Sequence, residues 1–303
     1  MNNNLTIDIM IEPTNRCNFR CPTCFSHQDD RPKTDLKFGV FKKFIDINKH
    51  YIGSLSLFNY GEPLLNKDIF RMIAYAKENG ISYTKVATNG FFLTQKASKM
   101  LLLSGLDHLS VSLDGASEDT YKVFRKGGCF HRVLSNIRSC VYQKKELMSK
   151  MKIEAQFIIM KHNESELKHA VKLSKRLGVD IIRLKTLLVK KKAWAKFLPV
   201  SEKYSRYSKK PHFLGCRKPL SELVINSDGT VLPCCYIVGL RPIKKYSLGN
   251  IRKSSLVDIL KTKKYSGFVR QCALYKDAIS CCRDCQEGNS KLDHKIIKFN
   301  ARP

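Results

Sequence analysis

The chain has 303 residues, of which 43% are hydrophobic and 10% aromatic, so it can bury a core and is neither disordered nor fibrous. It lacks an apolar run long enough to cross a bilayer and lacks the pattern of a secretory signal, so we expect a cytoplasmic protein with no membrane segment. Its 55 Lys and Arg residues against 26 Asp and Glu residues give a net charge of +29, which favours acidic partners.

The first two-thirds of the chain alternate between strand-like and helix-like segments. Six strands are expected, at residues 7–11, 54–58, 82–87, 108–112, 152–159 and 180–184. Periodic segments between them predict helices at residues 69–78, 96–104, 130–146 and 164–177. Repeated strand–helix units are typical of a parallel sheet with crossover helices. We therefore predict an α/β fold with a partial (β/α)6 barrel.

The pattern changes after about residue 185. Residues 222–226 and 230–233 flank Ser227-Asp228-Gly229, which is a hairpin signal, and residues 256–260 are typical of a short helix. We place a domain boundary at Val189. Residues 1–189 then form the core domain, and residues 190–303 form a small C-terminal α+β domain that contains cysteines.

The twelve cysteines are unevenly placed. Three lie between Cys17 and Cys24, and seven lie between Cys216 and Cys285. Clustered cysteines in a cytosolic protein more often bind metal or perform redox chemistry than form disulfides. The other two, Cys129 and Cys140, are expected to be ordinary buried thiols.

The N-terminal cysteines, Cys17, Cys21 and Cys24, have the spacing C-x3-C-x2-C and directly follow the first strand. Thiolates suit iron–sulfur clusters, and three of them around a [4Fe–4S] cluster leave one iron open for a substrate or cofactor. A structural zinc site would instead use four ligands. The spacing therefore predicts a [4Fe–4S] site with an open iron.

This triad resembles the radical S-adenosylmethionine (SAM) superfamily, and the family's later motifs follow in order at successive strand ends. Asn59-Tyr60-Gly61-Glu62-Pro63 resembles the GGEP motif, in which the glutamate would accept hydrogen bonds from the SAM ammonium group. Thr88-Asn89-Gly90 and Ser110-Val111-Ser112-Leu113-Asp114-Gly115 end the third and fourth strands. The family often has an aromatic residue before its third cysteine, where this chain has Thr23. By resemblance, the SAM-binding residues are Gly61, Glu62, Asn89, Ser112, Asp114 and Arg125.

The C-terminal cysteines include a Gly229-x4-Cys234 segment and a C-x2-C pair, and their spacing alone fits zinc and [4Fe–4S] equally well. They are similar to the SPASM domain of radical SAM enzymes, in the shortened one-cluster form called twitch. That form occurs in the radical SAM dehydrogenases that oxidise an aminocyclitol alcohol in butirosin biosynthesis. The resemblance implies a second, auxiliary [4Fe–4S] cluster with four ligands: Cys216, Cys234, Cys282 and Cys285.

Three cysteines of the tail remain outside this ligand set: Cys235, Cys272 and Cys281. An exchange of Cys281 or Cys235 into the set is an open alternative. One interpretation is that they are small buried residues that pack well. The other is that Cys235 or Cys281 is catalytic and returns a hydrogen atom to a substrate radical, as in radical SAM epimerases.

The resemblance implies an enzyme that cleaves SAM reductively to a 5′-deoxyadenosyl radical and abstracts hydrogen from a small polar, sugar- or cyclitol-like substrate, giving dehydrogenation or epimerisation. Its partners would be this small molecule and an acidic electron donor such as flavodoxin or ferredoxin. Maturation of a ribosomal peptide is an alternative, disfavoured because the first strand begins too close to Met1 for a fused leader-binding domain. A nucleic-acid-binding Zn/Fe–S protein or a tRNA-modifying enzyme is a second alternative. It leaves the ordered SAM motifs unexplained, so nucleic acid is not the expected partner.

Overall fold

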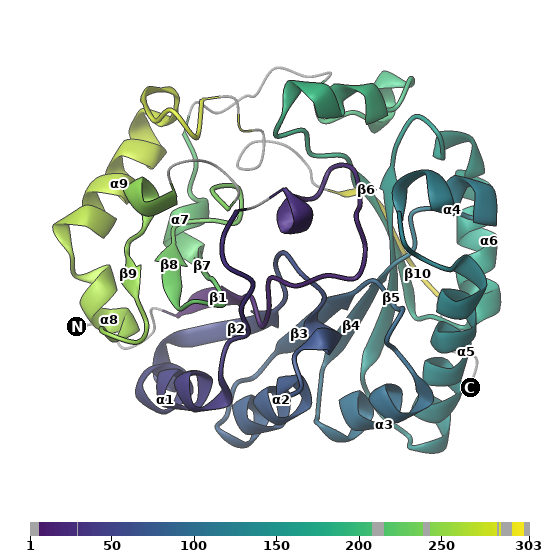
Figure 1. Cartoon of the computed structure of the whole chain (residues 1–303), viewed down its shortest axis with the longest axis horizontal. Coiled ribbons are helices and arrows are strands. Elements are labelled where there is room, and N and C mark those ends of the chain that lie inside the picture. Colours follow the sequence, from purple (N-terminus) through teal and green to yellow (C-terminus); the bar gives the residue numbers. More distant parts are fainter. Residues whose placement is uncertain are drawn as a thin grey trace. The chain divides into compact units, whose positions relative to one another are not determined.

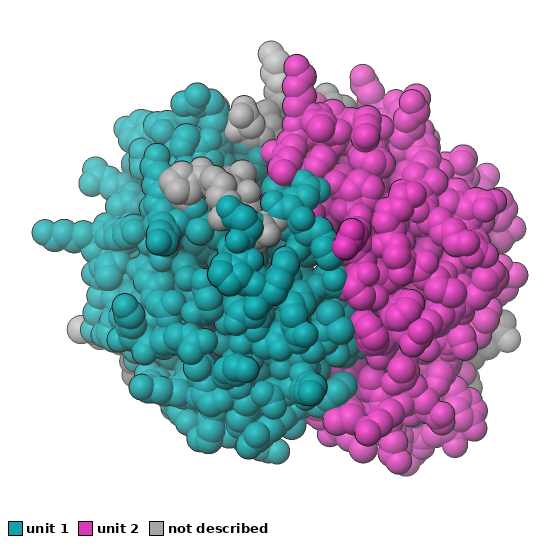
Figure 2. Space-filling view, in the orientation of Figure 1, with its two compact units in different colours: residues 1–17, 25–85, 211–289 teal, residues 18–24, 86–210, 290–303 magenta. Residues whose placement is uncertain are grey.

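The computed structural model describes residues 6–28, 30–207, 215–238, 243–283, 285 and 293–299. The chain divides into two compact units (Figure 2). Unit 1 contains residues 1–17, 25–85 and 211–289, and unit 2 contains residues 18–24, 86–210 and 290–303. Among the described residues, every helix is too short or too polar to cross a lipid bilayer.

The sheet of unit 1 is built around β1 (Ile7–Ile11), which is parallel to β2 (Ile52–Leu57) on one side and to β7 (Glu222–Ile225) on the other. Ile9 pairs with Leu55 of β2 and with Leu223 of β7, and all three side chains are buried. Beyond β2, the sheet continues in parallel into β3 (Thr84–Thr88). Thus β7, which lies in the C-terminal segment that starts at Cys216, joins the sheet formed by the N-terminal strands.

Beyond β7, the sheet of unit 1 is antiparallel. It continues through β8 (Thr230–Leu232) and β9 (Gly249–Asn250). The helices of this unit are α1 (Phe38–Asn48), α2 (Ile69–Glu78), α7 (Lys218–Ser221), α8 (Leu256–Leu260) and α9 (Lys263–Leu274). Figure 1 shows α8 and α9 beside the strands β8 and β9. The side chain of Asn48, the last residue of α1, accepts a hydrogen bond from the Leu256 backbone at 2.8 Å, which attaches the start of α8 to the end of α1.

Unit 2 continues the strand–helix alternation. Its parallel strands β4 (His108–Ser112), β5 (Lys152–Ile159) and β6 (Ile181–Thr186) lie in that order, and β10 (Asp293–Lys298) adds to β6 in antiparallel fashion. Its helices are α3 (Gln95–Leu103), α4 (Glu118–Phe124), α5 (Phe130–Glu146) and α6 (Leu167–Leu177). Along these strands, buried apolar residues alternate mostly with polar ones; examples are Val111, Ile153, Phe157 and Ile182.

The predicted α/β alternation is confirmed: strands β1 to β6 occur where strands were expected, the pairings within each unit are parallel, and β1, β4 and β5 have the predicted ends. The hairpin around Gly229 is also confirmed as β7 and β8. The boundary at Val189 stays a prediction, because the two units interleave along the chain. Cys140 is buried as expected, whereas Cys129 is exposed because it lies at the N-cap of α5, so that expectation was wrong.

Candidate functional site

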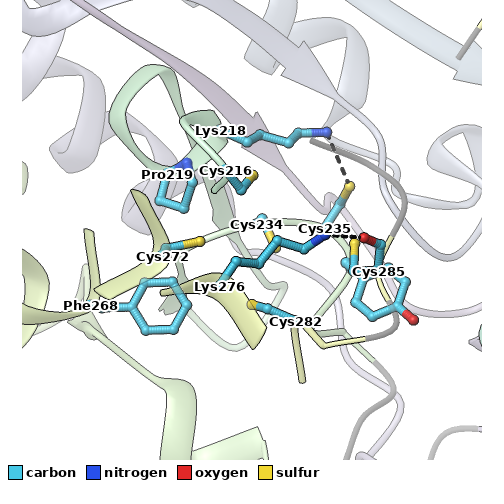
Figure 3. A pocket seen from close by; sticks show the side chains of 11 residues that line it. Cys216, Lys218, Pro219, Cys234, Cys235, Phe268, Cys272, Lys276, Cys282 and Cys285 are labelled. Atoms are coloured by element: carbon cyan, nitrogen blue, oxygen red, sulfur yellow. Dashed lines mark hydrogen bonds between the residues drawn. The ribbon is translucent and has the colours of Figure 1, made fainter. Parts of the chain in front are cut away.

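The C-terminal cysteines line one cavity inside unit 1 (Figure 3). Six thiols contribute to it: Cys216, Cys234, Cys235, Cys272, Cys282 and Cys285. The other lining residues are Lys218, Pro219, Tyr236, Phe268 and Lys276. All four cysteines of the predicted auxiliary ligand set therefore meet at one place, although up to 69 positions separate them in the sequence.

Backbone hydrogen bonds place these cysteines. The amide of Cys216, just before α7, donates to the carbonyl of Cys272 in α9 at 2.8 Å. The amide of Cys285 donates to the carbonyl of Cys282 at 3.1 Å, which turns the C-x2-C pair so that both residues face the cavity. Cys234 follows β8, so the hairpin supplies the remaining predicted ligand.

The thiols of this cavity interact with one another. The pKa of Cys272 is lowered because the thiols of Cys216 and Cys282 donate hydrogen bonds to its sulfur, and the pKa values of those two donors are raised for the same reason. Burial raises the pKa of Cys234. The Cys272 sulfur is thus within hydrogen-bonding distance of the sulfurs of Cys216 and Cys282.

The lining suits a thiolate-bound iron–sulfur cluster. Among the described residues that line the cavity, none is an Asp, Glu or His, so the metal-binding atoms there are cysteine sulfurs. Sulfur ligands prefer soft metals and iron–sulfur clusters. The thiols line the cavity rather than converge on a point. No group of three or more Cys, His, Asp or Glu side chains in the described segments has the arrangement of a metal-ion site.

The remaining cysteines of the tail differ in position. Cys235 lines the cavity, and the Nζ of Lys218 donates to its Sγ at 3.7 Å. Cys281 is buried, with its Sγ 3.6 Å from the Sγ of Cys282, and is not among the described residues that line the cavity. Cys272 lies in the cavity, although the motif spacing gave it no role. The two lysines were also missed, because a lysine in a basic chain has no distinguishing sequence signal.

The loop with the N-terminal triad spans the boundary of the two units: Cys17 ends a segment of unit 1, and Cys21 and Cys24 belong to unit 2. All three cysteines are partly exposed. Within unit 2, the amide of Cys24 donates to the carbonyl of Cys21 at 3.1 Å, and Arg20 donates its amide to the carbonyl of Lys126 at 2.9 Å. These bonds shape the short loop that contains Cys21 and Cys24.

Two of the predicted SAM-binding residues, Asp114 and Arg125, form an ion pair with each other beside Cys21. Arg125 also donates from Nη1 to the Sγ of Cys21 at 3.7 Å. Burial raises the pKa of Cys21 to about 11, and the Arg125 charge opposes this rise. Asp114 is fully buried with φ +51°, and its Oδ1 accepts from the amide of Ile158 at 2.6 Å. Both carboxylate oxygens of Asp114 are thus engaged by protein groups.

Asn89 and Ser112 also belong to unit 2. The side-chain amide of Asn89 donates to the Oδ1 of Asn18 in the cysteine loop at 2.9 Å, and its own Oδ1 accepts from the Phe91 amide at 2.9 Å. Ser112 is partly exposed at the end of β4. Asn89 therefore fixes the loop that contains Cys21.

Gly61 and Glu62 lie in unit 1, after β2. Gly61 has φ +98°, and a Cβ there would lie 2.1 Å from the carbonyl oxygen of Thr14, so only glycine fits. Glu62 is buried, its amide donates to the Arg16 carbonyl at 2.8 Å, and its Oε1 accepts from the Leu64 amide at 3.1 Å. The motif therefore packs against the segment that leads directly into Cys17.

Comparison with known proteins identifies the family of the chain. The family described as the radical SAM superfamily matches residues 11–170, and an iron–sulfur cluster-binding domain, SPASM, matches residues 216–286. A probable GTP 3′,8-cyclase of Saccharolobus solfataricus is 30% identical over 178 residues, which is 58% of this chain; the chain spans only 56% of that relative's length. A tungsten-containing aldehyde ferredoxin oxidoreductase cofactor-modifying protein of Pyrococcus furiosus is 26% identical over 91% of this chain and 86% of its own length.

Among solved structures, BtrN in complex with AdoMet and 2-DOIA is similar over 97% of this chain and 99% of its own, with a TM-score of 0.62 and 18% identity. That likeness concerns the fold. The radical SAM match covers more than half of the chain and includes the cysteine triad and the motifs at the ends of β2 to β4. The chain therefore belongs to the radical SAM superfamily and has a C-terminal SPASM iron–sulfur domain.

Proposed function

We propose that this enzyme abstracts a hydrogen atom from a small polar, sugar- or cyclitol-like substrate and completes the reaction as a dehydrogenation or an epimerisation. The thiol-lined cavity supports this most, because it gathers the four predicted ligands of an auxiliary cluster. BtrN, whose structure contains 2-DOIA, is similar over 97% of this chain and 99% of its own, and it provides the parallel for this substrate class.

In this proposal, Cys17, Cys21 and Cys24 hold the SAM-binding cluster, and Cys216, Cys234, Cys282 and Cys285 hold the auxiliary one. Together, the bound SAM and its cluster supply a 5′-deoxyadenosyl radical that can abstract an unactivated C–H hydrogen. Arg125 places a positive charge beside the Cys21 sulfur, which stabilises the thiolate. Glu62, which is buried directly after Gly61, would accept hydrogen bonds from the SAM amino group.

The two outcomes need different residues. Dehydrogenation needs an acceptor for the second substrate electron, which the auxiliary cluster would provide. Epimerisation needs a hydrogen-atom donor, and we place it at Cys235 rather than Cys281, because Cys235 lines the cavity and Cys281 is not among the described residues that line it. Restoring the Cys235 thiol would then need a proton from solvent and one electron, which an auxiliary cluster held by the four predicted ligands could supply.

The first experiment compares iron and acid-labile sulfide per chain, after anaerobic reconstitution, in wild type and Cys282→Ala/Cys285→Ala. We expect a two-cluster content in wild type and a one-cluster content in the variant. A one-cluster content in both, with zinc bound, would make the C-terminal domain structural and would contradict the proposal.

A second experiment tests the substrate class. Reduced enzyme is incubated with SAM and an aminocyclitol deuterated at its carbinol carbon, and deuterium is measured in the 5′-deoxyadenosine formed. Transfer of deuterium supports the proposal. Transfer from a labelled peptide instead would indicate a peptide maturase. Tight nucleic-acid binding with a steep salt dependence and no SAM cleavage would indicate the binding-protein alternative.

A further inference from the structure

Lys276 lies inside the thiol-lined cavity and is only 4% exposed. It begins the short 3-10 helix Lys276–Ala278 that follows α9. Its Nζ donates a hydrogen bond to the backbone carbonyl of Cys285. Figure 3 shows its side chain extending among Cys234, Cys282 and Cys285, which are three of the four proposed auxiliary ligands.

A lysine so deeply buried needs an anionic partner. Lysine is almost never fully buried unless it is paired, because removing an ammonium group from water is costly. The Cys285 carbonyl satisfies one of its three donors and supplies no negative charge. Within the described part of the chain no carboxylate lies within ion-pair distance of Lys276. The described groups that line the cavity with it and can become anionic are the cysteine thiols and the phenol of Tyr236.

The second lysine of the cavity is placed differently. The Nζ of Lys218 lies 3.5 Å from a carboxylate oxygen of Glu222 as well as near the Cys235 sulfur. About a fifth of its side chain is exposed to solvent, since its relative accessibility is 20%. The charge of Lys218 is therefore partly compensated by Glu222 without any cluster. Of the two described lysines that line the cavity, Lys276 is the one without a carboxylate partner among the described residues.

We propose that Lys276 is the charge partner of the auxiliary cluster and a positioning residue that raises its reduction potential. A cluster bound by four thiolates is already negative, and its reduction adds one more electron. A fixed cation in a poorly solvated cavity stabilises the reduced state more than the oxidised one. The inference rests on the proposed auxiliary cluster. It explains how that cluster could accept an electron from the substrate, because a higher reduction potential favours the reduced state.

The test uses the full chain with Cys17→Ala, Cys21→Ala and Cys24→Ala as the parent, so that only the auxiliary cluster can assemble. Into this parent we place Lys276→Met, Lys276→Arg and, as a matched control, Lys264→Met, which removes one charge from an exposed position of α9. Iron content is measured first, and the midpoint potential is then determined by a redox titration followed by electron paramagnetic resonance.

We expect a more negative potential in Lys276→Met and parental values in Lys276→Arg and Lys264→Met. A potential in Lys276→Met equal to that of the parent would overturn the inference, although the proposed function would stand. A parent without any bound cluster would refute the proposed function itself, and the inference with it.

Lys276→Met can also fail to hold its cluster, in which case Lys276→Gln joins the comparison of iron content. Loss of iron in both uncharged variants, with retention in Lys276→Arg, would show that the charge is required and would support the inference. Loss of iron in all three Lys276 variants would show that Lys276 acts only through its hydrogen bond to the Cys285 carbonyl. That result would overturn the inference.

Discussion

At the scale of single residues, the buried ion pair of Glu12 with Arg31 lies within unit 1, where Ser227 of the C-terminal segment also binds Glu12. Glu12 directly follows β1 and binds Arg31 through two hydrogen bonds of 2.9 and 3.0 Å. Its Oε1 also accepts from the amide and the hydroxyl of Ser227 at 3.2 and 2.9 Å. Burial raises the pKa of Glu12, and Arg31 opposes that rise. The fold at this point therefore depends on the guanidinium.

Replacement of Arg31 tests this dependence. Arg31→Met leaves a buried carboxylate without its cation, so we expect the free energy of unfolding to fall by about 3–5 kcal/mol at neutral pH. Without Arg31, the folded-state pKa of Glu12 rises further above its unfolded value. The loss of stability is therefore full above this folded-state pKa, where Glu12 is charged. It shrinks as the pH falls through this pKa, because Glu12 then becomes protonated and neutral. Urea denaturation of the variant and of Glu12→Gln/Arg31→Met across pH measures both effects. A loss that does not change with pH would contradict this account.

At the scale of elements, the local parts of the site were predictable and the long-range pairings were not. The cysteine spacings and the ends of β1, β4 and β5 follow from short stretches of sequence. The parallel pairing of β7 with β1 was not anticipated, because it joins residues about two hundred positions apart and leaves no periodic signal. The ion pair of Asp114 with Arg125 was missed for a related reason. A sequence motif identifies the residues of a site but does not show which of them bind each other.

The hairpin that positions Cys234 yields a prediction at this scale. Gly229 has φ +87°, and a Cβ there would lie 2.7 Å from the Oδ1 of Asn250. We expect Gly229→Ala to destabilise the protein by more than about 1 kcal/mol and to lower the iron bound in the C-terminal domain. Gly267→Ala is the matched control, because a Cβ at that helical position meets no atom within 4 Å and should stabilise α9 by about 0.5–1 kcal/mol. Equal iron contents in the two variants would show that the hairpin does not position a ligand.

At the scale of the whole molecule, the dominant feature is the excess of basic residues, with a net charge of +29. Charge of this size affects association more than folding, because exposed charges attract oppositely charged proteins over the distance that salt permits. It was evident from composition alone, whereas the burial of one particular lysine, Lys276, among thiols required the structure. We therefore propose an acidic one-electron carrier such as flavodoxin or ferredoxin as the electron donor.

The rate of reduction by flavodoxin tests that pairing. If the basic surface attracts the donor, raising the ionic strength should slow reduction of the enzyme's clusters by about tenfold or more, because salt screens the attraction between the two proteins. Photoreduced deazaflavin, which is small and needs no docking surface, should reduce the enzyme at a rate nearly independent of salt. Stopped-flow absorbance of the clusters measures both rates. An equal salt dependence for the two reductants would mean that the basic charge serves another partner, since the electrons would then enter without electrostatic docking.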